Sequence, residues 1–149
     1  MNELNSEDIK EAIVKTLLTI APNVQVYKEA VSNPIYPHFF VHQISVMDES
    51  AGLYHTLLYS MDIRYRTTSD PSTDLRLQKN LDEMSLLLLT NFNIIDFDGG
   101  KIRCSDKTTE KEDGVLHFFT TLKTMVRLEK KKEKNIKQMK LEVKIDGQI

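Results

Sequence analysis

Two segments of the chain alternate between apolar and polar side chains over a length that is unusual for a single strand. Apolar side chains fall mainly at odd positions from Leu53 to Arg66 and at even positions from Val115 to Leu128. A period of two is typical of a half-buried β-strand. At about 3.3 Å per residue each strand spans roughly 46 Å, against a diameter of about 40 Å for a compact chain of this size. Unless they bend, these strands project beyond the core, and soluble proteins usually cover such strands with another chain.

Two further segments have the period of a helix. The first begins at Ser6, a good N-cap, and ends before Pro22 and Asn23. The second has Ser69 or Asp70 as its cap and Pro71 in its first turn, and ends before Asn93. The stripes expected to face the core are Ile9, Ile13, Leu17 and Ile20 in the first helix and Leu77, Leu81, Met84 and Leu88 in the second.

Shorter strands fill most of the remaining chain. We predict a short strand over Val24–Lys28 and a central strand from His38 to Met47, which the polar turn 48–52 joins to the first long strand as an antiparallel hairpin. A second hairpin pairs Asn93–Phe97 with Lys101–Ser105. The polar octet 106–113 is predicted to be a mobile loop, and the segment after Leu128 has both helical and strand spacing.

This order of elements contains no repeated β-α-β unit. It predicts one α+β domain over residues 1–149, with an antiparallel or mixed sheet packed against two helices and a basic C-terminal extension from about residue 130. A content of 40% hydrophobic and 28% charged residues fits a single core. The apolar runs are too short to cross a bilayer and the N-terminus lacks the pattern of a signal peptide, so we expect a cytoplasmic product.

Charge is distributed unevenly along the chain. Residues 123–149 hold nine bases and four acids, a net of +5, which leaves −7 for the first 122 residues because the whole chain carries −2. A basic end on an acidic body suits nucleic-acid binding, head-to-tail packing of identical subunits, or simply a solvated terminus.

The side chains that could carry chemistry are few. His38 and His42 share a strand face but lie roughly 13 Å apart, too far for one zinc ion, while His55 and His117 become neighbours only if the two long strands pair. Cys104 has no second thiol and is predicted to fill a small apolar space. No phosphate-binding glycine motif occurs. We therefore predict no catalytic residue, no cofactor and no metal.

Two functional alternatives rest on particular residues. Asp96 and Asp98 beside a turn resemble the paired carboxylates of metal-dependent nucleases, although turn chemistry explains them fully. Six aromatic residues on the predicted strands could stack nucleic-acid bases, but their spacing favours a core position. These aromatic residues are Phe39, Phe40, Tyr59, Tyr65, Phe118 and Phe119.

Several segments, in order along nearly the whole chain, resemble the phage tail terminator family. The resemblance is carried by the N-terminal helix Ile9–Ile20, the segment Tyr36–Val41, the strand Met61–Tyr65, and the segment Asp113–Phe118, which leads into a long strand and a polar tail. It implies a non-enzymatic virion protein that forms a hexameric ring on the last ring of the tail tube, stops tube polymerisation and provides a surface for head joining.

The same resemblance implies the partners. These are further copies of the chain and the tail tube protein, with sheath and head-completion proteins as additional candidates, DNA passing through the lumen, and no membrane. A head-tail connector of the same particle, and a single-stranded nucleic-acid-binding protein, are the alternatives. The predicted subunit or tube interface comprises Asp48, Glu49, Lys107, Glu110, Lys111, Glu112, Arg127, Lys130, Lys131, Lys132 and Lys134.

Overall fold

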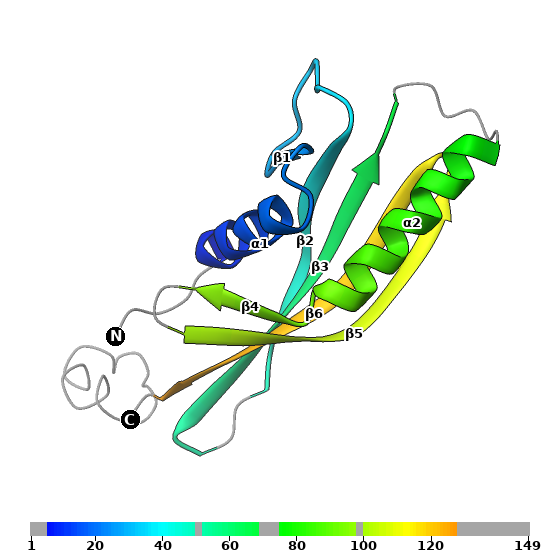
Figure 1. Cartoon of the computed structure of the whole chain (residues 1–149). Helices are drawn as coiled ribbons and strands as arrows, with labels where there is room; N and C mark the ends of the chain where they lie inside the picture. Colours follow the sequence, from blue (N-terminus) through cyan, green and yellow to red (C-terminus); the bar gives the residue numbers. More distant parts are fainter. Residues whose placement is uncertain (1–5, 50–51, 69–74, 98–99, 128–149) are drawn as a thin grey trace.

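The computed structural model describes residues 6–49, 52–68, 75–97 and 100–127, which form two helices and six strands (Figure 1). Both long strands and both helices predicted from the sequence are present, so the predicted α+β class is confirmed. The elements are α1 (Ser6–Ile20), β1 (Gln25–Tyr27), β2 (His38–Asp48), β3 (Tyr54–Arg66), α2 (Leu75–Asn91), β4 (Ile94–Phe97), β5 (Gly100–Glu112) and β6 (Val115–Arg127).

The six strands form one mixed sheet in the order β1-β2-β3-β6-β5-β4. Only the short β1 runs parallel to its neighbour, and the other four pairs are antiparallel. The two long strands β3 and β6 lie side by side at the centre and pair from Tyr54 opposite Arg127 to Tyr65 opposite Leu116. The alternation in the sequence therefore reflects two neighbouring strands that present their apolar side chains to the same core.

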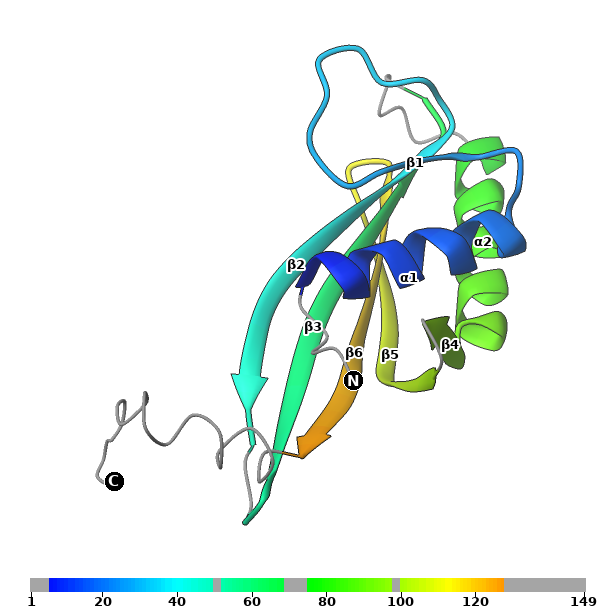
Figure 2. The ribbon, with the colours of Figure 1, turned by 90° about the vertical axis from the view of Figure 1, so that its left-hand side faces the viewer.

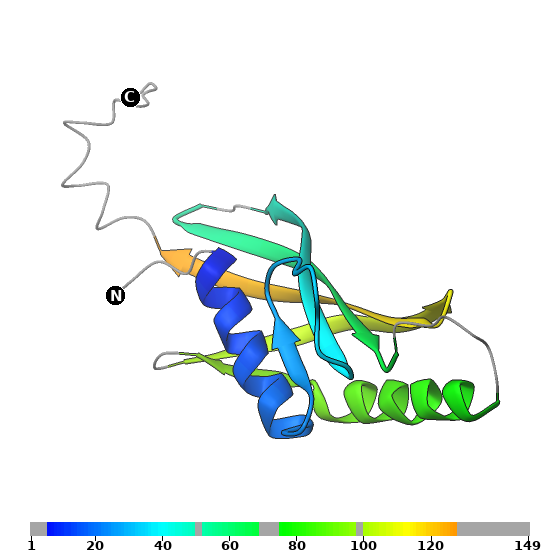
Figure 3. The ribbon, with the colours of Figure 1, turned by 90° about the horizontal axis from the view of Figure 1, so that it is seen from above.

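The core lies between one face of the sheet and the two helices, and Figure 3 shows α2 lying beside the strands. The predicted stripe of α2 is buried, as are Ile9, Ile13 and Leu17 of α1, and they meet the side chains of Met61, Ile63 and Phe118. In Figure 2, α1 crosses in front of the central strands, and in Figure 1, α2 runs along β5. We call the opposite side of the sheet the outer face; it carries the side chains that alternate with the core positions, among them Phe40, His42, Asp62, Arg64, His117 and Phe119.

Cys104 belongs to this core, on β5 opposite Leu122. Burial raises the pKa of its thiol to about 12, and the nearby Lys107 opposes that shift only weakly. A thiol with this pKa stays protonated at neutral pH, and the thiolate is the reactive form. The position therefore agrees with the prediction of a small apolar filler.

The prediction of a mobile loop over residues 106–113 is wrong. β5 continues to Glu112 and pairs with β6 as far as Val115, with an irregularity between Ser105 and Thr108 where Asp106 has φ 52°. The strand forms although its side chains are polar, because the β6 ladder pairs its backbone. Side chains of this strand also bind α2, as the Ser85 and Thr109 hydroxyls lie 2.8 Å apart.

Figure 2 shows β2, β3 and β6 continuing past α1 to a far end that neither helix covers. Four large apolar side chains are exposed there: Ile44 (52%), Val46 (42%), Met47 (58%) and Leu53 (50%). The strands thus project beyond the core, as their length predicted. We call residues 44–49 together with Gly52 and Leu53 the projecting end.

Candidate assembly surface

The outer edge of β2 is open along most of its length (Figure 2). β1 pairs only with His38, Phe39 and Phe40, and in the described part of the chain no strand pairs with this edge from Val41 to Asp48. Edge strands that are protected from other chains commonly contain lysine or proline, and neither occurs in this stretch. A bulge between Gln43 and Ser45 does interrupt the β2–β3 ladder, and bulges are among the features that discourage edge pairing. On both sides of this bulge, however, the described edge has unpaired backbone available to a strand of another chain.

The open edge and the projecting end form one continuous surface. Side chains on both sides of β2 are exposed from Ile44 to Asp48, because no helix reaches that far. The backbone of β2 is bound to β3 one residue beyond the strand, since the Glu49 N–H donates to Thr56 O at 2.7 Å. Exposed apolar side chains next to free strand backbone are the usual composition of a surface that another chain covers.

The predicted interface residues do not gather on one surface. Asp48 and Glu49 lie at the projecting end, where Asp48 approaches His55 Nδ1 at 3.3 Å, and the backbone of Arg127 pairs with Tyr54 at the same end. The four predicted residues of β5 lie toward its hairpin with β6, at the other end of the sheet. Lys130, Lys131, Lys132 and Lys134 lie outside the described residues.

Two of the predicted interface lysines hold β5 to α2. Lys107 Nζ donates to Leu89 O at 2.8 Å, and Lys111 Nζ lies 2.5 Å from Asp82 Oδ1. Glu110 and Glu112 are exposed. The assignment of all these residues to an interface remains a prediction, and the structure gives the two lysines an internal role as well.

A buried carboxylate on the outer face escaped the sequence reasoning. Asp62 is only 4% exposed; it accepts from Arg64 Nε at 2.9 Å and lies 3.1 Å from His117 Nδ1. Phe119 stacks on the His117 ring, with 5.8 Å between the ring centroids, and Arg64 lies over Phe40 at 5.8 Å. Alternation alone places Asp62 and Arg64 on one face of β3, but the approach of His117 needs the β3–β6 register.

The histidines and acids considered for metal chemistry stay apart. His55 pairs with Val126 and His117 with Arg64, so the two histidines are separated by nine positions along β3, roughly 30 Å. No cluster of three metal-binding side chains occurs among the described residues. Asp96 is exposed and bound to Lys101 at 2.6 Å, and Asp98 lies outside the described residues.

The six aromatic residues divide between the two faces. Phe39, Tyr59, Tyr65 and Phe118 are buried in the core and cannot stack on a base. Phe40 and Phe119 are half-buried on the outer face, each stacked on a histidine. The core position that the spacing favoured is therefore confirmed for four of the six.

His38 packs beneath the segment that leads from β1 to β2, against Tyr27 and Tyr36. Its Nδ1 donates to Ile35 O at 3.1 Å. Burial lowers the pKa of His38 below its ordinary value of 6.5; the hydrogen bond to Ile35 opposes this shift and the charge of Arg66 adds to it. The folded protein therefore binds a proton at this site less readily than the unfolded chain.

Because of this difference, the free energy of unfolding should fall as pH drops below about 6.5 toward the lowered pKa. We expect urea unfolding to show a smaller change in stability between about pH 7.5 and about pH 5.5 in His38→Phe than in the unsubstituted chain. Equal changes in the two proteins would contradict a neutral, buried His38.

A small α+β subunit with an exposed apolar end, and with a sheet edge that no described strand covers, has features typical of structural assembly proteins. The comparison with known families agrees: the family described as "Phage tail terminator protein" matches residues 8–134. The chain belongs to the phage tail terminator family and is a structural protein of the phage tail. In the described residues, neither helix has the length and apolarity needed to span a bilayer.

Other comparisons add little. No curated protein matches the chain. Eleven chains of solved structure match. One of them shares 11% sequence identity over 81% of this chain and 94% of its own length, with a TM-score of 0.38. That likeness is too distant to support an argument about this chain.

Proposed function

We propose that this protein forms a ring, a hexamer by its family resemblance, that caps the end of the tail tube, stops further polymerisation of the tube and offers the surface to which the head joins. The observation that carries the proposal is the open edge of β2 running into the apolar projecting end. No described strand of the same chain pairs with this surface from Val41 to Asp48, whereas neighbours in a ring would cover it. Membership of the tail terminator family supports the proposal that the ring binds at the end of the tail tube.

The ring is proposed to close through head-to-tail contacts. A contact between two different surfaces of identical subunits generates either a closed ring or an open filament, depending on the rotation between subunits. The open edge lies on the β1–β2 side of the sheet, and β4 forms the opposite side. The two sides differ, so a contact between the β2 side of one copy and the β4 side of the next joins two different surfaces, as a ring requires.

The proposal is tested by growing tail tubes from purified tube protein in the presence of this chain. We expect tubes to stop lengthening once the chain is added, and electron micrographs to show a ring at one tube end. Tubes that lengthen at the same rate with and without the chain would overturn the capping role. A ring that binds the head portal but leaves tube growth unchanged would instead support the head-tail connector of the same particle.

A further inference from the structure

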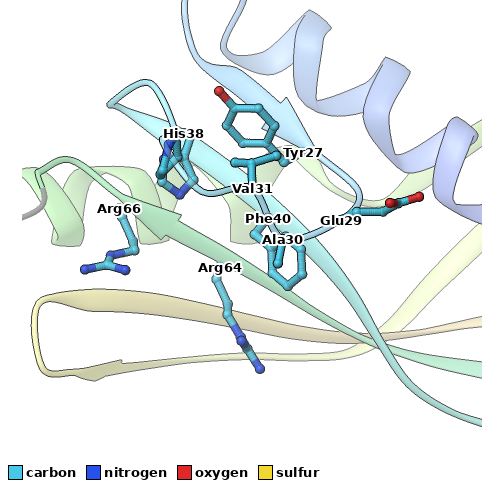
Figure 4. Close-up of a pocket in the computed structure, with 9 residues that line it drawn as sticks. Tyr27, Glu29, Ala30, Val31, His38, Phe40, Arg64 and Arg66 are labelled. Carbon is cyan, nitrogen blue, oxygen red and sulfur yellow. The ribbon is translucent and has the colours of Figure 1, made fainter.

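A pocket of about 240 Å³ lies at the end of β2 opposite the projecting end (Figure 4). The segment between β1 and β2 forms one wall, and the start of β2 and the end of β3 form the other. In Figure 4, Arg64 and Arg66 both extend from β3, with their guanidinium groups pointing in different directions, and Tyr27 and Val31 lie on the other side of the pocket. The pocket is lined by Tyr27, Glu29, Ala30, Val31, Pro34, His38, Phe40, Arg64 and Arg66.

The two arginines differ in how their charges are satisfied. Arg64 is bound by the buried Asp62 at 2.9 Å. Arg66 stacks over the Tyr36 ring at 5.9 Å, but in residues 6–49, 52–68, 75–97 and 100–127 it has no carboxylate partner. Its Nε is buried and makes no hydrogen bond. The Arg66 side chain as a whole is only half-buried, so an anion from outside the chain can approach its charge, although the Nε atom itself is covered.

The other titratable groups of the pocket do not supply that anion. No ion pair joins Glu29 to either arginine within the described part of the chain, and Figure 4 shows its carboxylate at the far side of the pocket. His38 donates its Nδ1 proton to Ile35 O, and its lowered pKa keeps the ring neutral at pH 7. The charge that faces a ligand is therefore the positive charge of the guanidinium groups.

We propose that this pocket receives the carboxylate of Glu49 from the projecting end of a second copy of the chain. Glu49 is exposed and has no ion pair among the described residues, whereas its neighbour Asp48 is close to His55. The backbone of Glu49 is held by Thr56, so its side chain is offered from an ordered strand end. A carboxylate fits the planar fork of an arginine better than any other common side chain does.

Met47 gives the contact an apolar part. Glu49 follows the last residue of β2, and its bond to Thr56 continues the pairing with β3 by one residue. Residues two apart in such a ladder point to the same side, so Met47 and Glu49 are presented together, and Met47 is 58% exposed. The unbranched, flexible side chain of methionine adapts to irregular apolar surfaces. We assign it to the pocket wall that Val31 and Pro34 form beside the guanidinium groups.

The contact is head-to-tail because the pocket and the projecting end lie at opposite ends of β2, whose eleven residues span roughly 35 Å. It thus deepens the proposed ring by naming one of its subunit contacts, and it rests on that proposal. Each copy would donate one Glu49 and accept another. The same contact then repeats from each copy to the next, and the copies form a closed ring if the rotation between neighbours returns the last copy to the first.

The experiment exchanges the two charges. Arg66→Glu and Glu49→Arg should each weaken self-association of the full chain about tenfold or more, because each places like charges together. The double variant carries the pair in reverse and should recover most of the affinity. Sedimentation equilibrium at several concentrations measures the affinity in solution, and chemical cross-linking of chains bound to tube ends measures the same contact on the tube.

Two controls keep the result interpretable. Arg76→Glu makes the same charge change on the exposed start of α2 and should leave self-association unchanged. Glu49→Gln changes only an exposed strand end, so it tests the contact even if Arg66→Glu does not fold. Normal rings from Glu49→Gln and Glu49→Arg would overturn this contact while leaving the ring intact. A chain that stays monomeric both in solution and on tubes would overturn the ring as well.

Discussion

Replacing Phe118 by alanine should lower the free energy of unfolding by about 3–5 kcal/mol, the usual cost of emptying a buried aromatic site. Phe118 is fully buried on β6, and its ring meets Phe92 edge to face at a centroid distance of 5.3 Å. Phe92 directly follows α2, so this pair ties that helix to the centre of the sheet. The loss of one ring therefore leaves a cavity where two layers meet.

The adjacent residue supplies a matched control. Phe119 is on the same strand but points to the outer face, where it is half-buried and stacked on His117. We expect Phe119→Ala to cost only about 1 kcal/mol, since it removes a partly exposed stacking contact and leaves no enclosed cavity. Urea unfolding followed by circular dichroism compares the two variants. Equal losses would contradict the assignment of the core to one face of β6.

Replacing Val46 by lysine should weaken ring assembly about tenfold or more while leaving the subunit folded. Val46 is 42% exposed on the open edge of β2 and is not part of the buried core cluster, so the substitution empties no core site. A lysine on an edge strand opposes pairing with another chain, because covering the strand would bury its charge. Sedimentation velocity and the fraction of capped tubes measure the assembly.

The control for this prediction is Leu18→Lys on α1. Leu18 is 44% exposed, so the same kind of charge is introduced at nearly the same exposure but away from the β2 edge. This variant should assemble as the unsubstituted chain does, and thermal unfolding should show that both variants fold. Two results would contradict a role of the β2 edge in assembly. One is normal ring formation by Val46→Lys, and the other is an equal loss of ring formation in both variants.

Much of the fold could be predicted because apolar side chains alternate wherever a strand meets the core. The error at β5 has a physical cause: residues 106–112 are polar, and their place in the sheet depends on backbone pairing with β6 and on side chains that bind α2. One local signal was available. Asp113 and Gly114, both with positive φ, form the two-residue turn typical of a tight hairpin, which implies a strand before it.

The surfaces were harder to predict than the core. The open edge of β2 follows from the small extent of β1, and the pocket at Arg66 follows from how the segment between β1 and β2 folds back over β3. Neither the open edge nor the pocket produces a periodic pattern or a motif in the sequence. Charge alone selected Lys107 and Lys111 as interface residues, although both reach partners on or beside α2. Charged side chains are visible in the sequence, but which of these charges are neutralised by a partner in the folded chain is visible only in the structure.

The three-residue strand β1 limits what can join the sheet. It occupies the β2 edge at His38–Phe40 and leaves the eight positions from Val41 to Asp48. An incoming strand can therefore lie along at most about 26 Å of this edge before it meets the end of β1. In the proposed ring, β1 would therefore be a fixed stop that sets how far neighbouring subunits can slide along each other, and every subunit would carry its own copy of that stop.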